Sequence, residues 1–321
     1  MEMIKITNLI KTYGNKTVVD GISFEVQNGE VFGFLGPNGA GKTSTINMMI
    51  GLSQPTAGSI MINGLDIRKQ TKKAQAIMGI VSDESNLYNE MDGFDNLCFC
   101  AALYGMRRDE REAKARKLLD HFSLKDAGNR TFKTYSRGMR RKLTIAAALM
   151  HSPQIIFLDE PTTGIDVEST RHIWDMIVKL KHEGTTIFLT THYIEEAERI
   201  CDRIAFIANG RIVASGTPSQ LMENATFGHK LRLVLDKNAV CYAEELKIYF
   251  PSNNVMVCPD HTLTIESEQR IPLSPIVEFF RERDIDVYEA SELRPSLEDV
   301  FVKLTGIQAS TLREDEKKSR L

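Results

Sequence analysis

The feature that most constrains the fold of this chain is an apolar pentapeptide followed directly by a glycine-rich loop. Val31–Leu35 has the composition of a buried strand, and Gly36–Thr43 matches the pattern G-x-x-x-x-G-K-[ST]. The glycines permit a backbone that turns successive N–H groups toward one phosphate, and a helix starting at Gly41 adds the positive end of its dipole. We therefore expect an α/β domain that binds a polyphosphate. The expected binding residues are Gly36, Pro37, Asn38, Gly39, Ala40, Gly41, Lys42, Thr43 and Ser44.

A second motif supplies carboxylates. Four apolar residues, Ile155–Leu158, predict a strand buried on both faces and are followed by Asp159 and Glu160. Because ligands of an open α/β sheet bind at the carboxyl ends of its strands, these acids should face the phosphates. Lys42 would reach the β- and γ-phosphates, while Thr43 and Asp159 would ligate Mg²⁺. Glu160 would polarise the attacking water; alternatively, the acidic pair only ends the strand before a turn.

Three further segments extend this pattern, and with them the chain resembles the ATP-binding subunits of ABC transporters from near its N-terminus to about residue 217. The segments are Tyr135–Met139, Thr163–Asp166 and Thr190–His192, which resemble the family's signature loop, D-loop and switch-histidine segment. The first keeps the signature serine and second glycine, Ser136 and Gly138, but has Arg137 in place of the first glycine.

The resemblance implies ATP as the ligand and gives several residues a role. Lys42, Glu160 and His192 would be catalytic, with His192 contacting the γ-phosphate. Ser136 and Gly138 would contact ATP held by a facing subunit, so that two ATP molecules lie between two such subunits. A lone histidine at the end of a strand is otherwise more often structural.

Two positions leave alternatives open. Tyr13 stands where the family carries an aromatic side chain that stacks on adenine, although an isolated tyrosine near a strand usually just packs. Asp83 follows Met78–Ser82 at the place of a family glutamine that serves Mg²⁺, the attacking water and the membrane partner. We expect Asp83 to ligate Mg²⁺ and preserve coupling with an altered metal dependence. The alternative is an acid of the loop without a role in the site.

Composition narrows the class of protein. A chain of 321 residues with 42% apolar content is long enough for about two domains, and a net charge of -3 argues against a nucleic-acid partner. The basic run Arg140–Lys142 is therefore expected to be surface or phosphate-facing charge. The five cysteines, which lack metal-ligand spacing, are expected to be reduced thiols; they are Cys98, Cys100, Cys201, Cys241 and Cys258. No signal-peptide pattern or apolar run of about 18 residues predicts a membrane span.

The pattern along the chain predicts two domains and a tail. Residues 1–217 would form the ATP-binding domain, with an antiparallel layer at 4–9 and 18–26 and a helical subdomain between Asp92 and Phe122. Residues 218–306 would form a small α+β domain with the order β-α-β-β-α-β, and 307–321 a disordered tail. Ser296 would cap a last helix with Asp299 three residues on. Its apolar face would contain Leu297, Val300, Phe301 and Leu304.

The resemblance implies an ATPase subunit of an exporter, since the segment Pro295–Phe301 is similar to the ending of subunits that serve drug, antibiotic, sodium or polysaccharide export. Such a subunit would pair with a second ATP-binding subunit, expected to be a copy of itself. It would drive a separate membrane permease from the cytoplasmic, inner face of the cell membrane. The alternatives are a soluble ATPase of the same family acting on ribosomes or DNA, an importer subunit, and a regulatory module without turnover.

Overall fold

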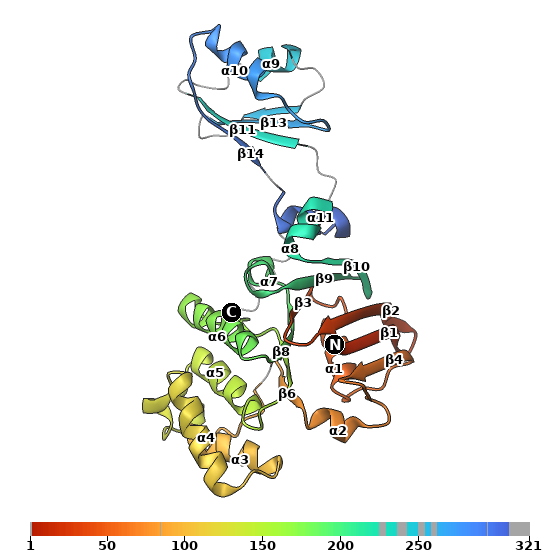
Figure 1. Cartoon of the computed structure of the whole chain (residues 1–321), viewed down its shortest axis with the longest axis vertical. Helices are drawn as coiled ribbons and strands as arrows, with labels where there is room; N and C mark the ends of the chain where they lie inside the picture. Colours follow the sequence, from red (N-terminus) through yellow and green to blue (C-terminus); the bar gives the residue numbers. More distant parts are fainter. Residues whose placement is uncertain are drawn as a thin grey trace. The chain divides into compact units, whose positions relative to one another are not determined.

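The computed structural model describes residues 2–83, 85–224, 229–235, 243–249, 254–257, 262–293 and 295–307. The chain divides into two compact units: one runs up to Ser219 and resumes at Phe301, and the other is Gln220–Val300 (Figure 1). The expected domain limits at residues 217 and 306 stay predictions. The expected tail after residue 307, Cys241 and Cys258 lie outside the described residues.

A six-stranded sheet forms the centre of the first unit, in the order β10-β9-β3-β8-β7-β6 (Figure 1). The strands are β3 (Val31–Leu35), β6 (Met78–Val81), β7 (Ile155–Asp159), β8 (Thr186–Thr191), β9 (Arg203–Ala208) and β10 (Arg211–Gly216). All neighbours are parallel except β9 and β10, which form an antiparallel hairpin that turns at Asn209 and Gly210. Every residue of β3, β7 and β8 is buried, as expected for apolar strands covered on both faces. Their carboxyl ends therefore meet at one edge.

An antiparallel sheet lies on one side of this centre, in the order β2-β1-β4-β5, which confirms the expected layer. Its strands are β1 (Glu2–Tyr13), β2 (Lys16–Gln27), β4 (Ala57–Ile62) and β5 (Leu65–Asp66). The two sheets share one hydrophobic core. Phe24 of β2 stacks on Phe32 of β3 with ring centroids 5.3 Å apart and also lies against Phe188 of β8.

The helices of the first unit cover the sheets and build a separate helical subdomain. They are α1 (Lys42–Met49), α2 (Thr71–Gln75), α3 (Gly93–Leu103), α4 (Arg108–His121), α5 (Arg137–Ala148), α6 (Val167–His182) and α7 (Ile194–Ile200). Short 3-10 helices, Lys125–Ala127 and Phe132–Thr134, lead into α5. Side-chain caps start three of the helices: Asp92 accepts from the Asp95 N–H at 2.7 Å, and Ser136 and Asp166 cap α5 and α6 in the same way. Within the described ranges, none of the helices is long and apolar enough to cross a membrane.

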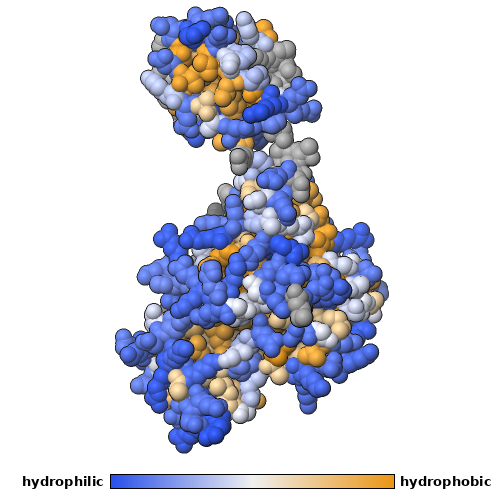
Figure 2. Space-filling model, viewed as in Figure 1, coloured by the Kyte–Doolittle hydropathy of each residue, from blue (hydrophilic) through white to orange (hydrophobic). Residues whose placement is uncertain are grey.

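The second unit confirms the expected β-α-β-β-α-β order. It contains β11 (His229–Leu235), α9 (Ala243–Tyr249), β12 (Asn254–Val257), β13 (Thr262–Ser267), α10 (Leu273–Arg281) and β14 (Val287–Leu293), after α8 (Pro218–Asn224). The strands are antiparallel in the order β12-β13-β11-β14, and Leu233, Ile265 and Phe280 are fully buried in a core of their own. Figure 2 shows hydrophobic side chains gathered on one face of this unit.

The last helix, α11 (Leu297–Thr305), has the expected capping box. The Asp299 N–H donates to the Ser296 hydroxyl at 3.1 Å, and the Ser296 N–H donates to the Asp299 carboxylate at 2.9 Å. Leu297 and Phe301 are fully buried, and the ring of Phe301 meets Phe206 of β9 edge to face. The prediction was wrong for Leu304, in the last turn of the helix, which is 42% exposed.

Candidate functional site

The glycine-rich loop leaves the carboxyl end of β3 and leads into α1, as the sequence predicts. Gly39 and Gly41 have φ values of +80° and +106°, a region that side chains strain to enter. A Cβ on Gly41 would lie 2.7 Å from the Val18 carbonyl oxygen, and one on Gly36 would lie 2.3 Å from that of Ile207. The loop therefore needs glycine for its conformation and for its closeness to β2 and β9.

Lys42 is folded back beneath this loop. Its ammonium group donates to the carbonyl oxygens of Gly36 at 2.7 Å and Pro37 at 3.2 Å, and lies 3.0 Å from the Glu160 carboxylate. The side chain is only 5% exposed. A buried ammonium group is thus held beside the loop by two carbonyls and one anion, all of which a phosphate oxygen can replace.

Glu160 follows β7 and is the charged centre of the site. Its φ of +50° is unusual for a residue other than glycine. The carboxylate contacts Lys42 with one oxygen and His192 Nδ1 with the other, at 2.6 Å. Burial by itself would raise the pKa of Glu160, but the hydrogen bond with His192 and the charge of Lys42 outweigh it and lower the pKa to about 2. Glu160 is therefore fully ionised at neutral pH.

Asp159 and His192 complete the edge of the sheet. Asp159, at the end of β7, accepts a short hydrogen bond from the Thr190 hydroxyl. Burial raises its pKa, and hydrogen bonds from Thr190 and Thr43 partly offset that rise. Among the described residues, no group bonds to His192 Nε2, which is buried. An unpartnered buried ring nitrogen beside a phosphate-binding loop can bond to a ligand oxygen.

One cavity of about 220 Å³ brings most of the predicted residues together. It is lined by Val18, Asn38, Gly39, Gly41, Lys42, Thr43, Ser44, Asp83, Asp159 and Glu160. The exposed Asp83 therefore lies on the same cavity as the loop and the two acids. This grouping is the one that the sequence motifs predict for a nucleotide phosphate site.

Seven predicted residues do not line this cavity. Gly36, Pro37 and Ala40 belong to the glycine-rich loop itself, and His192, just after β8, contacts Glu160. The other three lie elsewhere. Tyr13, at the end of β1, is 50% exposed, and the Lys11 ammonium group lies over its ring. Ser136 and Gly138 lie at the start of α5, where the Ser136 hydroxyl accepts from the Met139 N–H. A Cβ on Gly138 would lie 2.3 Å from the Ser169 hydroxyl oxygen of α6, so this glycine is also required within the chain.

Sequence reasoning missed Arg141. We expected the run Arg140–Lys142 to be surface or phosphate-facing charge, and for Arg141 this is wrong, since it is 8% exposed. Its guanidinium binds backbone carbonyl oxygens: Nε donates to Pro161 at 2.9 Å, and Nη2 donates to Asp159 at 2.8 Å and also to Glu160. The available signal was spacing, because Gly138, Arg141 and Ile145 fall on the buried face of α5.

Glu196 of α7 was missed as well. It is fully buried, and burial raises its pKa. One carboxylate oxygen accepts from the Thr162 hydroxyl at 2.9 Å and the Trp174 indole at 3.0 Å. It thereby ties the helix after His192 to α6 and to the segment after Glu160.

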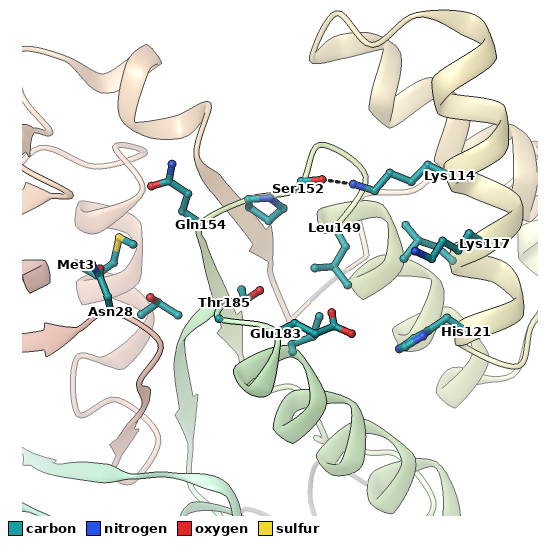
Figure 3. A pocket seen from close by; sticks show the side chains of 15 residues that line it. Met3, Asn28, Lys114, Lys117, His121, Leu149, Ser152, Gln154, Glu183 and Thr185 are labelled. Atoms are coloured by element: carbon teal, nitrogen blue, oxygen red, sulfur yellow. Dashed lines mark hydrogen bonds between the residues drawn. The ribbon is translucent and has the colours of Figure 1, made fainter. Parts of the chain in front are cut away.

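A larger cavity, of about 620 Å³, lies at the opposite edge of the sheet (Figure 3). Lys114, Lys117 and His121 of α4 line one side of it, and Gln154 and Thr185, just before β7 and β8, line the other. These are the amino ends of parallel strands, whereas ligands of such sheets bind at the carboxyl ends. The smaller cavity at the glycine-rich loop is therefore the candidate site.

Comparison with known proteins places residues 19–163 in the family described as ABC transporter. The linearmycin resistance ATP-binding protein LnrL of Bacillus subtilis is 35% identical over 95% of this chain and 98% of its own length. The daunorubicin/doxorubicin resistance ATP-binding protein DrrA of Streptomyces peucetius is 36% identical, over 94% of this chain and 92% of that protein. The Nod factor export ATP-binding protein I of Rhizobium etli is 34% identical, over 95% of this chain and 94% of its own length.

Solved structures agree on the fold. An ATP-binding subunit of an ABC transporter is 30% identical, with a TM-score of 0.64 over 69% of this chain and 92% of that chain. A dimeric ATP-binding cassette in a post-hydrolysis state, bound to ADP and Pi, is 25% identical. Its TM-score is 0.63, over 67% of this chain and 98% of that chain.

Proposed function

This chain belongs to the ATP-binding subunits of ABC transporters, and we propose that it contributes half of each of two ATP sites in a dimer of identical chains. The subunit is an ATPase of the exporter type, similar over nearly its whole length to proteins of drug resistance and Nod factor export. The observation that carries the catalytic part of the proposal is the position of Glu160, which is held between Lys42 of the glycine-rich loop and His192, just after β8.

The contacts of Lys42 suggest how ATP engages the site. The β- and γ-phosphates would take over its ammonium group from the carbonyls of Gly36 and Pro37 and from Glu160. Glu160 then loses one of the two groups that lower its pKa, and its carboxylate becomes a better proton acceptor for the attacking water. In its protonated form, His192 would donate from Nε2 to a γ-phosphate oxygen while Nδ1 still donates to the Glu160 carboxylate.

The acidic residues of the cavity fit Mg²⁺. Mg²⁺ usually keeps several water and phosphate ligands and takes one or two carboxylates from the protein. The described parts of the chain contain no cluster of three or more His, Cys, Asp or Glu side chains able to hold a metal alone. Asp159, the Thr43 hydroxyl and Asp83 line the loop cavity and would hold the ion. When bound, Mg²⁺ neutralises charge on the β- and γ-phosphates.

The position of Ser136 and Gly138 supports a role in the facing subunit's site. Neither residue lines the cavity of its own loop, and both lie at the N-terminus of a helix of 12 residues, where N–H groups suit an anion. Two solved structures of one similar cassette show it as a dimer. We propose that the start of α5 closes over the γ-phosphate of the partner's ATP.

An exposed apolar surface suggests where the permease docks. Tyr88, Phe99 and Leu103 are 54%, 37% and 72% exposed, and the first two rings meet edge to face. They belong to α3 and the segment between Asp83 and α3, so a partner there would contact the same segment that reaches the ATP site. We propose that a membrane permease covers this surface and holds the subunit at the cytoplasmic face of the membrane.

We also propose that Tyr13 stacks on the adenine ring of ATP.

Trapping the dimer tests the proposal. Glu160→Gln should bind ATP, lose turnover by about 10²-fold or more and elute as an ATP-dependent dimer in light scattering. Ser136→Ala in the Glu160→Gln background should bind ATP as a monomer without forming that dimer. A Glu160→Gln variant with full turnover would refute the catalytic assignment, and a Ser136→Ala dimer of unchanged stability would refute the role in the partner's site.

A further inference from the structure

We propose that Arg141 is a positioning residue that couples the two ATP sites of the dimer. It would connect the phosphate-sensing segments of its own chain to the α5 N-terminus, which serves the partner's site. The inference rests on the proposed dimer and adds the path by which one site reports to the other.

The first observation is the number of segments that one buried guanidinium joins. Nη1 donates to the carbonyl oxygens of Ser82 at 2.5 Å and Asp83 at 3.3 Å, just after β6. Nη2 and Nε bind the carbonyls of Asp159, Glu160 and Pro161, at and after the end of β7. Nη1 and Nη2 each donate to two carbonyl oxygens. The planar guanidinium thus fixes the backbone at Asp83 and at Glu160.

The second observation is that Arg141 leaves the carboxylates free for the reaction. Burial lowers the pKa of Arg141, whereas the charges of Asp83, Asp159, Glu196 and Glu160 raise it. Nevertheless, its hydrogen bonds with the described residues all go to backbone carbonyls. The residue therefore orients the acids through their main chain and does not compete with water or phosphate for their side chains.

A second contact of α5 reinforces the connection to the Asp83 segment. The Thr144 hydroxyl, one turn after Arg141, lies 2.9 Å from the Ser85 hydroxyl. Arg141 binds the carbonyls at Ser82 and Asp83, so α5 holds this segment on both sides of the Asp83 side chain. A shift of the segment on ATP binding would be passed to the helix.

The helix carries that shift to the partner's site because it is continuous. Ser136 caps α5, and Arg141 lies five positions later, about 7.5 Å along the axis at the rise of an α-helix. The helix interior contains no proline or glycine after Gly138 that would let its two ends move separately. Movement of the carbonyls around Glu160 therefore moves the N-terminus that is proposed to close over the second ATP.

The neighbouring Arg140 provides a matched control. It lies on the same helix, but its guanidinium donates to the carbonyls of Tyr135 at 3.2 Å and Lys133 at 2.7 Å and lies over the Phe132 ring. All three residues belong to the segment that leads into α5. A general effect of losing a guanidinium from α5 should therefore appear in both variants, and loss of coupling only in the Arg141 variant.

The test uses full-length Arg141→Lys and Arg140→Lys proteins. Lysine keeps the charge but cannot bind the separate carbonyls in one plane. For Arg141→Lys we expect kcat to fall by about 10²-fold, the scale of a misplaced catalytic group, with monomer affinity for ATP within about threefold of wild type. In the wild type, the Hill coefficient for ATP should lie between 1 and 2, the number of ATP sites in the dimer. In Arg141→Lys it should fall toward 1. Arg140→Lys should keep the wild-type Hill coefficient and most of its kcat.

The outcomes separate the inference from its premise. Wild-type kcat and Hill coefficient in Arg141→Lys would overturn the inference. Equal losses in both arginine variants would also overturn it, by showing a general defect of α5. A lowered melting temperature with lost ATP binding in Arg141→Lys would indicate a structural role alone. If Ser136→Ala in the Glu160→Gln background still dimerises normally, the proposed dimer itself has failed, whatever the Arg141 result.

Discussion

The contacts of Glu160 predict that its neutral replacement destabilises the protein without nucleotide and that ATP repairs the loss. In Glu160→Gln, the buried Lys42 keeps its two carbonyl partners but loses the carboxylate that is its one anionic partner among the described residues. Burial raises the pKa of Glu160, and the contacts with His192 and Lys42 more than offset this and lower the pKa from 4.5 to about 2, a net stabilisation of the carboxylate by about 3 kcal/mol. Glutamine still accepts hydrogen bonds, so we expect about half of this, about 1 to 2 kcal/mol, to be lost from the free energy of unfolding.

The assay is the melting temperature of wild type and Glu160→Gln with and without ATP, measured without Mg²⁺ to prevent turnover. For a domain of this size, the loss should lower the melting temperature by about 3 to 6 °C. ATP should raise it more in the variant, because the phosphates restore an anion beside Lys42. Glu198→Gln, on the exposed side of α7, removes a charge of the same sign and should have no such effect.

The pH dependence of stability gives an independent check that the ionised Glu160 carboxylate stabilises the fold. The folded pKa of Glu160 is depressed, so its stabilisation is complete above pH 4.5 and is lost as the pH falls toward 2. The difference between wild type and Glu160→Gln should therefore shrink from pH 5 to pH 3. A variant as stable as wild type at pH 7, or a difference that grows on acidification, would refute the reasoning.

Three further changes test the loop, the metal site and the permease surface. Gly41→Ala must adopt a strained φ of +106° with its Cβ against the Val18 carbonyl, and it should lower the affinity for ATP by at least about 10-fold. A Cβ at Gly39 meets nothing within 4 Å, so Gly39→Ala should lose less affinity. Equal losses of affinity would contradict the steric argument. Asp83→Ala should change the Mg²⁺ concentration for half-maximal ATPase and reduce stimulation by the permease, and an unchanged enzyme would make Asp83 a loop acid only. Leu103→Glu should abolish co-purification with the permease while leaving the isolated ATPase intact, unlike the equally exposed Leu52→Glu; retained binding would place the docking surface elsewhere.

Patterns of adjacent residues predicted the elements of this structure that depend mainly on residues close in the sequence. The apolar runs at β3 and β7 fix two buried strands, and a parallel sheet brings the loop after one beside the acids after the other. The same logic gave the order of the second unit and the capping box at Ser296. In each case a few adjacent residues carry the information.

The missed features depend on contacts between distant segments. Arg141 is buried because the ends of β6 and β7 offer carbonyls to one point on α5, and its basic neighbours hide this in the sequence. Glu160 has a positive φ, and Lys42 and His192 hold its side chain from two other segments of the chain. Glu196 is accommodated by a hydroxyl from one element and an indole from another.

The packing of Gly138 against Ser169 has a consequence for genetics. A substitution at Gly138 would meet both the hydroxyl oxygen, at 2.3 Å, and the Cβ of Ser169, at 2.8 Å. A screen for inactive mutants would therefore recover this position whether the helix interface or the partner's ATP had been disturbed. Ser169→Gly removes both obstructing atoms, so it should act as a suppressor of Gly138→Ala only if the defect is steric. Suppression or its absence would show which of two selective pressures maintains glycine at this position.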